Sequence, residues 1–296
     1  MTDDVASFVG GTRRVGLIGK PLKRRHSQVM HDAAFDAAGI DARYVLLELD
    51  PEAVGPAVAE ARASADWLGL GVTAPYKRVV AGLVDEVEPD AEAIGAVNNV
   101  TKDADGRLVG FNTDAPGFRA GVELAMGGSL AGRDVVVAGA GGAAHAVVHA
   151  CLAAGAARVT VANRTLSGAT TLVERFATVG PGDRAAVELG TSAADAAWGV
   201  ADLAVNATTV GMVDPGMTVP VDLLRADATV FDLVYVPAET PLLAAARARG
   251  LRAANGSEML VAQAAIAFER WTGIGGVADV MRTAVAPLLA DPTVTA

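Results

Sequence analysis

Short apolar runs alternate along the chain with longer Ala-rich stretches in which apolar residues recur every three or four positions. Short runs are typical of buried strands, and the longer periodic stretches are typical of helices. The first third of the chain therefore reads strand, helix, strand, helix, strand. The predicted segments are VGLIG (15–19), a helix at 29–39, YVLLEL (44–49), a helix at 51–63 and WLGLGV (67–72). This order predicts parallel strands with helices covering the sheet.

The same alternation restarts at residue 134 and continues to the end of the chain. The predicted strands are 134–140, 158–163, 203–207 and 229–234, and the predicted helices are 142–154, 165–177, 258–272 and 276–289. Two alternating sets predict two α/β domains. We place the boundary near a helix at 115–126, which ends at two glycines.

Composition narrows the classes of partner. Hydrophobic residues make up 52% of the chain and aromatic residues only 4%, so a sizeable core is expected to consist of Ala, Val and Leu side chains. Lys and Arg number 24 and Asp and Glu number 34, which gives a net charge of −10. An acidic chain without a basic stripe is a poor nucleic-acid binder, so positive groups for an anionic ligand must be local.

The cellular compartment is inferred from three features. The most hydropathic region, 134–161, is interrupted by glycines and histidines, and we interpret it as core rather than as a membrane span. The single cysteine, Cys151, excludes an internal disulfide and a cysteine metal cluster. The first ten residues, MTDDVASFVG, lack the basic and then apolar order of a signal peptide. We therefore expect a cytoplasmic protein without membrane or nucleic-acid partners, and a homodimer is compatible with the sequence.

A glycine-rich turn gives the sharpest general signal. In DVVVAGAGGAAHA, Gly139, Gly141 and Ala144 form G-x-G-x-x-A after a predicted strand and at the start of a helix. The first glycine permits a tight turn, the second lets a pyrophosphate approach the backbone, and the small third residue lets the helix pack on the strand. This context predicts a dinucleotide site; the alternative is a tight turn without a ligand.

The next strand ends in ANRT, where a dinucleotide site contacts the adenosine ribose. Asn163, Arg164 and Thr165 offer an amide, a guanidinium and a hydroxyl, with no carboxylate to repel a 2′-phosphate. An arginine suits a phosphate through its fork of donors, whereas NAD sites usually carry Asp or Glu here. The pattern favours NADP over NAD. The alternative is a helix capped by Thr165 beside a solvated Arg164.

Two charged residues follow predicted strands in the first domain. Lys77 ends GVTAPYK, and Asp114 lies in GFNTDAPGF after a hairpin with a DADG turn. Each has a simpler interpretation, a surface lysine at a helix start and an N-cap carboxylate. Their spacing cannot place them together. If they meet, the lysine can give or take the proton that accompanies hydride transfer, and the carboxylate can orient it and bind a substrate hydroxyl.

Taken together, the motifs resemble those of the shikimate dehydrogenase family in order along nearly the whole chain. The matching segments are GVTAPYK, GAVNN, GFNTDAPG, GAGGAAHA, NRT, VNATTVGM, DLVYVPAETPLL and GSEMLVAQAAIAFERWTG. The resemblance implies an N-terminal α/β substrate domain, a Rossmann domain and final helices that return to the first domain. It implies reversible, NADPH-linked reduction of 3-dehydroshikimate to shikimate, a small anionic polyhydroxy carboxylate.

The resemblance also implies domain bounds and site residues. The substrate domain would take in 1–118 and 259–296, and the Rossmann domain 119–258. Lys77 would be the acid/base and Asp114 its partner and a substrate ligand. The other expected substrate residues are Ser27, Thr73, Asn98, Tyr235, Gln263 and Arg25. The expected NADP residues are Gly139, Ala140, Gly141, Gly142, Ala143, Asn163, Arg164, Thr165, Thr208, Leu233, Gly256 and Met259.

The chain departs from the family pattern in the loop expected to bind the substrate carboxylate. That loop usually reads H-S-x-S-P-x-x-H, and here it reads RRHSQVMHD (24–32). Ser27 matches a family serine, while Arg25 stands for the first serine and Gln28 for the proline in one alignment. Arg25 could face the substrate carboxylate or belong to a solvated basic run. We hypothesise that this loop shifts preference toward quinate or an amino analogue.

Other departures are single residues. They are Gly71 for Asn, Ala115 for Gly, Gly168 where a second basic residue often supports the 2′-phosphate, and Glu258 for a frequent Gly. The change at position 168 weakens the NADP prediction without reversing it.

Three alternative functions share parts of this pattern. A quinate or aminoquinate/aminoshikimate dehydrogenase would share the scaffold. A methylene-tetrahydrofolate dehydrogenase shares the two-domain plan and a lysine, but GFNTDAPG and MLVAQ argue against it. A non-catalytic dinucleotide-binding regulator would be expected to lack Lys77 or Asp114. His145 and His149 have a spacing that suits a metal, but no third ligand is evident and no metal site is predicted.

Overall fold

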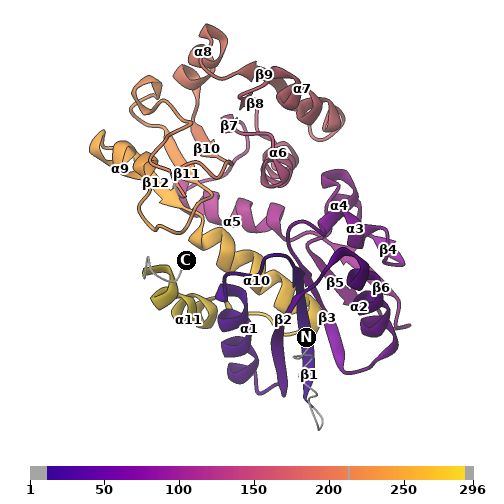
Figure 1. Cartoon of the computed structure of the whole chain (residues 1–296). Coiled ribbons are helices and arrows are strands. Elements are labelled where there is room, and N and C mark those ends of the chain that lie inside the picture. The colour runs from indigo at the N-terminus through magenta and orange to yellow at the C-terminus, as the bar shows by residue number, and fades with distance from the viewer. Residues whose placement is uncertain (1–11, 213, 291–296) are drawn as a thin grey trace. The chain divides into compact units, whose positions relative to one another are not determined.

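The computed structural model describes residues 12–212 and 214–290, so the N-terminal segment MTDDVASFVG lies outside the described residues. Backbone contacts divide the chain into two compact units (Figure 1). Unit 1 comprises the described residues up to Glu92, Ala96–Asn112 and Ala264–Val285, and unit 2 comprises Ala93–Gly95, Thr113–Gln263 and the described residues after Val285. The predicted bounds of a substrate domain and a cofactor domain stay a prediction.

Unit 1 is built on a mixed sheet in the order β2-β1-β3-β5-β6-β4. The strand β1 pairs in parallel with both β2 and β3, as the alternating pattern predicted, and β5 and β6 form the predicted antiparallel hairpin. The strands are β1 (Arg13–Gly19), β2 (Ala42–Glu48), β3 (Trp67–Val72), β4 (Glu86–Val87), β5 (Asn99–Lys102) and β6 (Leu108–Phe111). The helices are α1 (His26–Ala37), α2 (Pro51–Ala63) and α3 (Lys77–Ala81), with most of α4 (Pro89–Ile94), the second half of α10 (Ser257–Thr272) and the first part of α11 (Ala278–Ala290).

Glycines on β3 let an aromatic side chain lie directly against the sheet of unit 1. The Trp271 indole Nε1 donates a hydrogen bond to the Val100 carbonyl at 3.0 Å, and a Cβ on Gly69 would lie 2.5 Å from that indole ring. Trp271 also packs beside the rings of His31 and Tyr44. The small residue on β3 therefore fixes the position of the largest side chain on α10.

Unit 2 is built on a fully parallel sheet in the order β12-β11-β10-β7-β8-β9 (Figure 1). The strands are β7 (Asp134–Ala138), β8 (Arg158–Asn163), β9 (Asp183–Glu188), β10 (Leu203–Asn206), β11 (Thr229–Asp232) and β12 (Arg252–Asn255). The helices are α5 (Asp114–Met126), α6 (Gly142–Ala153), α7 (Leu166–Arg175), α8 (Ser192–Val200) and α9 (Pro241–Ala248), with the 3-10 turn η1 (Val221–Leu223). The strand order reverses between β7 and β10, which is where parallel sheets of this kind bind ligands.

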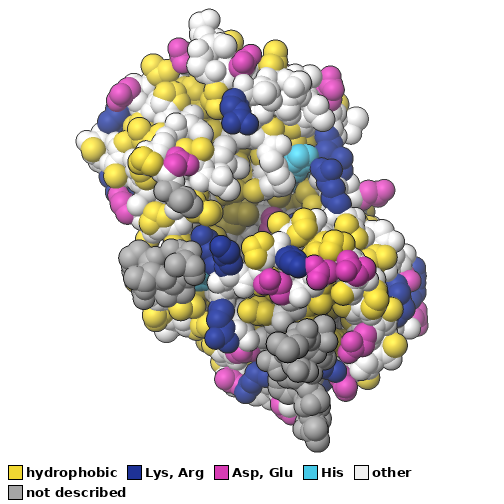
Figure 2. Space-filling view, viewed as in Figure 1, with side chains coloured by type: hydrophobic (Ala, Val, Ile, Leu, Met, Phe, Trp, Pro, Cys, Tyr) yellow, Lys and Arg dark blue, Asp and Glu magenta, His cyan; other side chains and the backbone are white. Residues whose placement is uncertain are grey.

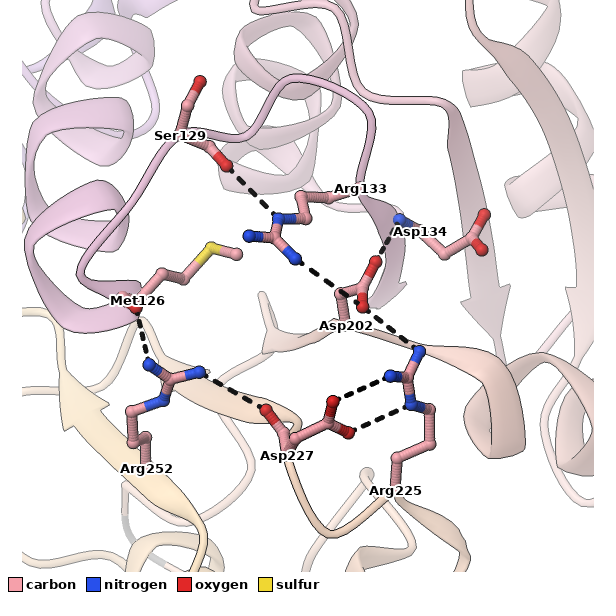
Figure 3. A network of polar contacts seen from close by, with 8 residues as sticks. All are labelled: Met126, Ser129, Arg133, Asp134, Asp202, Arg225, Asp227 and Arg252. Atoms are coloured by element: carbon pink, nitrogen blue, oxygen red, sulfur yellow. Dashed lines mark hydrogen bonds and ion pairs between the residues drawn. The ribbon is translucent and has the colours of Figure 1, made fainter.

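The amino-terminal edge of this sheet is held by ion pairs (Figure 3). Asp202, just before β10, accepts a hydrogen bond from the Asp134 backbone N–H at 3.0 Å and pairs with Arg225 at 3.2 Å. Arg225 also pairs with Asp227 at 2.8 Å, and Arg252 donates to the Met126 carbonyl at 2.8 Å. Exposed pairs of this kind contribute little individually. Together these contacts join the starts of several strands. The carboxyl edge of the sheet is held by other residues.

The core of unit 2 is built from small apolar residues, as the composition predicted. Val136, Ala204 and Val230 on three neighbouring strands pack with Trp198 of α8 and Leu242 of α9. The thiol of Cys151 on α6 is fully buried, and burial raises its pKa. A buried, protonated thiol is a poor nucleophile and behaves as a small apolar group.

The drawn face and the described helices bear on two features of the sequence, its mixed charge and its lack of a long apolar segment. On the face drawn in Figure 2, basic and acidic side chains are interspersed among apolar ones. Within residues 12–212 and 214–290, each helix is too short or too polar to cross a lipid bilayer.

The structure corrects several boundaries. The helix expected at 29–39 begins at His26, so most of the segment interpreted as a substrate-binding loop is the first two turns of α1. Asp114 follows the strand β6 as expected, and the helix predicted from residue 115 begins one residue earlier, at Asp114 itself. The elements β4, β9, β12, α3, α4, α8 and α9 were not predicted, because their sequences are short or lack a clear apolar period.

Gly69→Ala is expected to lower the free energy of unfolding by about 1–3 kcal/mol, because overpacking a filled site forces neighbours to move. The added Cβ would meet the Val100 carbonyl oxygen and the Trp271 ring. Gly55→Ala in α2 is the matched control, since nothing lies within 4 Å of its Cβ position. A helical alanine there should raise stability by about 0.5–1 kcal/mol. Denaturant unfolding measures both, and equal effects would contradict the packing argument.

Candidate active site

Two predicted substrate residues of unit 1 lie at neighbouring strand ends, Thr73 after β3 and Asn98 just before the antiparallel strand β5. After β3, the Thr73 backbone N–H donates to the Ile18 carbonyl at 2.9 Å. The Val72 N–H donates to the Asn98 carbonyl at 2.8 Å. The loop that leaves β1 joins them, because the Lys20 N–H donates to the Ala74 carbonyl at 3.1 Å. The sheet therefore brings Thr73 and Asn98 to one edge, with Asn98 buried and Thr73 half-buried.

Lys77 is the first residue of α3 and is half-buried. Its backbone carbonyl accepts a hydrogen bond from the Val97 N–H at 3.1 Å, next to Asn98. Tyr76, just before it, is 3% exposed and donates its hydroxyl to the Leu49 carbonyl at 2.7 Å. Lys77 thus begins a helix, as the simpler interpretation expected, but it is half-buried, and its backbone is fixed beside two other predicted substrate residues.

The altered segment 24–32 has a clear local structure. Ser27 lies in the first turn of α1 and is half-buried, while Arg25 precedes the helix and is exposed. The Arg25 Nε donates to the Gln28 Oε1 at 2.8 Å, and the Gln28 amide donates to the Tyr44 carbonyl at 3.1 Å. Gln28 thus ties Arg25 to the outer strand β2. These contacts explain what Gln28 does and leave the role of Arg25 toward a substrate a prediction.

His31 and Tyr44 form a buried ring stack beneath this segment. Their ring centroids lie 4.5 Å apart, and a Cβ on Gly71 would lie 2.5 Å from the Tyr44 hydroxyl oxygen. Gly71, which stands for the asparagine of the family pattern, therefore makes room for Tyr44. His31 is 2% exposed and its Nδ1 has no hydrogen-bond partner, and burial lowers its pKa to about 3. The ring is neutral at physiological pH.

Asp114 and Gln263 are brought together in unit 2 by close packing of α5 and α10. A Cβ on Gly117 would lie 2.7 Å from the Gln263 Cβ, and a Cβ on Gly121 would lie 2.9 Å from the Met259 nitrogen. The Thr113 hydroxyl, adjacent to Asp114, lies 3.3 Å from the Gln263 Oε1. Thr113 is the N-cap residue of α5, so Asp114 is not the capping carboxylate that a simpler interpretation suggested.

The glycine-rich turn joins β7 to α6 as predicted. Gly139 has φ +104°, a conformation that L side chains rarely adopt, and its Cβ position would lie 2.7 Å from the Thr208 Cγ2. Gly141 is the N-cap residue of α6, and Gly141, Gly142 and Ala143 are exposed. Nothing lies within 4 Å of the Cβ positions of the two glycines. Helix N–H groups facing open space suit an anionic group.

The segment NRT ends β8 and begins α7. The Asn163 amide donates to the Thr165 carbonyl at 3.1 Å and to its hydroxyl at 3.3 Å, while Arg164 is exposed. Thr165 is the N-cap residue and Arg164 is exposed, as the alternative expected, but the Thr165 side chain makes no capping hydrogen bond. A Cβ on Gly168 would lie 2.7 Å from the Asn163 Nδ2 and 3.8 Å from the Ala140 Cβ. Gly168 therefore leaves room for the asparagine to hold this turn.

Further predicted cofactor residues lie after β10, β11 and β12. A Cβ on Gly256 would meet the Leu233 carbonyl oxygen, so the two backbones are in close contact. Tyr235 and Met259 are half-buried. Glu258 stands where the family pattern frequently has Gly, and the sequence alone does not explain this departure. In the structure it lines a hollow of about 240 Å³ together with residues of α5 and β12.

Sequence reasoning missed three buried polar residues at this edge. Asn206 and Asp232 are the last residues of β10 and β11, and Thr240 is the N-cap residue of α9; each is at most 1% exposed. The sequence carries a signal for two of these residues, because an Asn and an Asp each end an apolar strand. His145 and His149 lie on α6 as predicted, and the described residues contain no cluster of three or more metal-ligating side chains.

Known families and proteins match this chain over most of its length. Residues 17–100 match the family model of the shikimate dehydrogenase substrate binding domain, 123–196 that of shikimate / quinate 5-dehydrogenase, and 256–286 that of the shikimate 5'-dehydrogenase C-terminal domain. A curated shikimate dehydrogenase (NADP(+)) from Symbiobacterium thermophilum is 42% identical over 288 residues, which are 96% of this chain and 97% of that protein. The chain belongs to the shikimate dehydrogenase family.

Solved members of the shikimate dehydrogenase family share the fold. A shikimate 5-dehydrogenase from Thermus thermophilus, in complex with NADP(H) and shikimate, is 36% identical with a TM-score of 0.82 and covers 93% of this chain and 99% of its own. A quinate dehydrogenase from Corynebacterium glutamicum, in complex with NAD, is 33% identical with a TM-score of 0.85 and covers 93% and 99%. The predicted fold class, two α/β domains of which one is of Rossmann type, is confirmed.

His31 predicts a pH dependence of stability. The pKa of His31 in the folded protein lies below its pKa in the unfolded chain. Its contribution to stability is therefore fully present above pH 6.5 and is lost as pH falls toward about 3. The loss arises because in this range the unfolded chain binds a proton that the folded protein does not. Between pH 7 and pH 5 the free energy of unfolding should fall by about 2 kcal/mol from this group. His31→Phe keeps a stacked ring and should lack this component. Unfolding curves of both proteins at the two pH values measure it, and parallel pH slopes would refute it.

Proposed function

We propose that the chain is an NADP-dependent dehydrogenase that interconverts shikimate and 3-dehydroshikimate. The observation that carries this proposal is near full-length identity of 42% to a curated shikimate dehydrogenase (NADP(+)), in a chain that retains Lys77 and Asp114. The proposed substrate domain takes in 1–118 and 259–296, and the proposed cofactor domain takes in 119–258. A homodimer stays a prediction.

Lys77 is proposed as the general acid/base. In the reductive direction its ammonium group gives a proton to the carbonyl oxygen of the substrate, and in the oxidative direction its amine takes the hydroxyl proton. Asp114 is proposed to orient that ammonium group and to accept a hydrogen bond from a substrate hydroxyl. Ser27, Thr73, Asn98, Tyr235 and Gln263 are proposed to bind the remaining oxygens and the ring. Polar groups at fixed positions reject substrates that lack a matching hydroxyl.

The residues of unit 2 fit a dinucleotide phosphate. The open N-terminal turn of α6 at Gly141–Ala143 suits the pyrophosphate, and the exposed Arg164 suits a 2′-phosphate. Thr208, Leu233, Gly256 and Met259 are proposed to line the nicotinamide end. When bound, the nicotinamide supplies or accepts the hydride. The protein binds and orients both reactants and moves the proton.

A second candidate is a quinate or amino-analogue dehydrogenase on the same scaffold. The specific observation that favours it is the segment 24–32, where Gln28 replaces proline and holds Arg25 beside Ser27. The similar fold of a quinate dehydrogenase makes the exchange of substrate structurally reasonable. Arg25 would then add a guanidinium to the carboxylate site.

Initial rates with shikimate and with quinate, each with NADP⁺ and NAD⁺, test both candidates. Shikimate with NADP⁺ is expected to give the highest kcat/KM. Lys77→Ala should lower kcat by roughly 10²–10⁴, because the proton transfer loses its catalyst, without a comparable change in NADP⁺ affinity. Arg78→Ala, an exposed cation at the next position, is the control and should keep full activity. Slow turnover of every pair by a protein that still binds NADP⁺ would reject the substrate assignment alone.

The turn around Asn163 gives a sharper prediction on cofactor choice. Gly168→Lys would add a second cation near Arg164, yet it is expected to weaken NADP⁺ binding roughly tenfold, because its Cβ displaces the Asn163 amide. Gly168→Ala should cause a similar loss, since the Cβ and not the charge is responsible. Arg164→Ala should lower the preference for NADP⁺ over NAD⁺. Tighter NADP⁺ binding by Gly168→Lys in a titration would contradict this account.

A further inference from the structure

A buried carboxylate that the proposed chemistry does not use lies at the carboxyl edge of unit 2. Asp232 is 0% exposed, and its partner in the strand register is Asn206, which is 1% exposed. Both residues end their strands where the sheet order has just reversed. An aspartate is rarely buried without a compensating partner, so its contacts need an account.

Asp232 is held by three neutral donors. One oxygen, Oδ1, accepts from the Asn206 Nδ2 at 2.9 Å and from the Val234 backbone N–H at 3.0 Å. The other, Oδ2, accepts from the Thr240 hydroxyl at 2.7 Å. Burial raises the pKa of Asp232, and donors to both oxygens oppose that effect by favouring the carboxylate form. The group therefore serves as an acceptor for segments on both sides of it.

The carboxylate fixes the orientation of the Asn206 amide. Because the charged form of Asp232 can only accept, the Asn206 NH₂ must face it, and the Asn206 Oδ1 must face the opposite way. That oxygen accepts from the Thr208 hydroxyl at 2.7 Å, the Thr208 N–H at 3.2 Å and the Thr218 hydroxyl at 2.9 Å. The same NH₂ donates to the Val210 carbonyl at 3.1 Å, so Asp232, the Val210 carbonyl and the Thr208 N–H together select one amide orientation.

The orientation of Thr208 follows from that of Asn206. Its hydroxyl donates to Asn206 and accepts from the Val210 N–H at 3.1 Å, so both functions of the hydroxyl are used within the loop. Its methyl group then faces Gly139, whose Cβ position would lie 2.7 Å away. The glycine turn is therefore packed against a side chain whose rotation is set by Asn206, and Asp232 is one of the groups that hold Asn206.

The same carboxylate fixes the segment after β11 at two points. The bond to Val234 holds the backbone between Leu233 and Tyr235, and the bond to Thr240 holds the start of α9, where Leu243 donates to the Thr240 hydroxyl at 3.3 Å. Leu233 is tied in turn, because its N–H donates to the Asn206 carbonyl at 3.0 Å. Residues 233–240 leave the sheet between these two anchors.

We propose that Asp232 is a positioning residue, which acts through Asn206, Thr208 and Thr240 to hold the loops after β10 and β11 in the arrangement that receives the nicotinamide end of the cofactor. This inference rests on the proposed function, in which Thr208 and Leu233 line the cofactor. Asp232 itself touches neither cofactor nor substrate in this account.

The test compares two Asp→Asn substitutions. One is at the carboxyl end of β11, and the other is at the amino end of the neighbouring strand β10. Asp232→Asn keeps the size of the side chain but turns an NH₂ group toward either the Asn206 amide or the Thr240 hydroxyl, both of which donate to the carboxylate. Asp202→Asn removes the same charge from the ion-paired amino-terminal edge, far along the strand direction from the turn. NADP⁺ affinity by titration and hydrogen exchange of the amides in 207–212 and 233–240 are measured for each protein.

Asp232→Asn is expected to weaken NADP⁺ binding roughly tenfold and to speed exchange in both loops, while Asp202→Asn leaves both unchanged. Altered exchange with unchanged affinity would overturn the positioning role and leave a structural one. Equal effects of the two variants would overturn it as a general charge effect. Should Asp232→Asn fail to fold, Thr240→Val removes the donor to Oδ2 together with the acceptor for the Leu243 N–H, and must give the same pattern. A wild-type protein that binds no NADP⁺ would reject the proposed function, while exchange would still report the loop ordering.

Discussion

Parallel pairing of β7 with both β8 and β10 is the constraint on which the candidate site depends. Parallel strands all end at one edge, so the segments that leave them must begin side by side. This places the turn at Gly139, the end of β8 at Asn163 and the end of β10 at Asn206 along one line. Each of these positions carries a residue whose side chain, or lack of one, is needed by its neighbour.

Close approach is how those segments stay in place. Gly139 faces Thr208, Gly168 faces Asn163, and Gly256 faces the backbone of Leu233. In each pair, the space that a Cβ of the glycine would take is occupied by an atom of the partner residue. The two edges of this sheet are held differently: exposed ion pairs join the strand starts, and a buried carboxylate with neutral donors joins the strand ends. Exposed pairs tolerate change, whereas a buried acceptor dictates the orientation of its partners.

The sequence predicted most of the fold because the apolar runs are regular and the glycine turns are well marked. The strands 67–72 and 158–163 agree with the structure to the residue. The short strands and the start of α1 were missed, since a two-residue strand has no period and Arg25 is not a typical cap.

The candidate site was predictable as a set of motifs but not as a set of contacts. In the sequence, Gly168 and Gly71 each lack a side chain that is frequent in the family. In the fold, each glycine leaves room for a neighbouring side chain, Asn163 for Gly168 and Tyr44 for Gly71. Asn206 and Asp232 were missed for a related reason, because a buried polar pair is recognisable only when the register of two distant strands is known.

Gly71 and Tyr44 also limit the order in which this chain can change. A side chain at position 71 would meet the Tyr44 hydroxyl, and Tyr44 cannot easily move because it is buried against His31. A side chain at position 71 and a tyrosine at position 44 therefore exclude each other in this packing. An asparagine can be accommodated at position 71 only when Tyr44 is replaced first or together with it. The two positions are coupled, and a substitution at one is judged correctly only when the residue at the other is known.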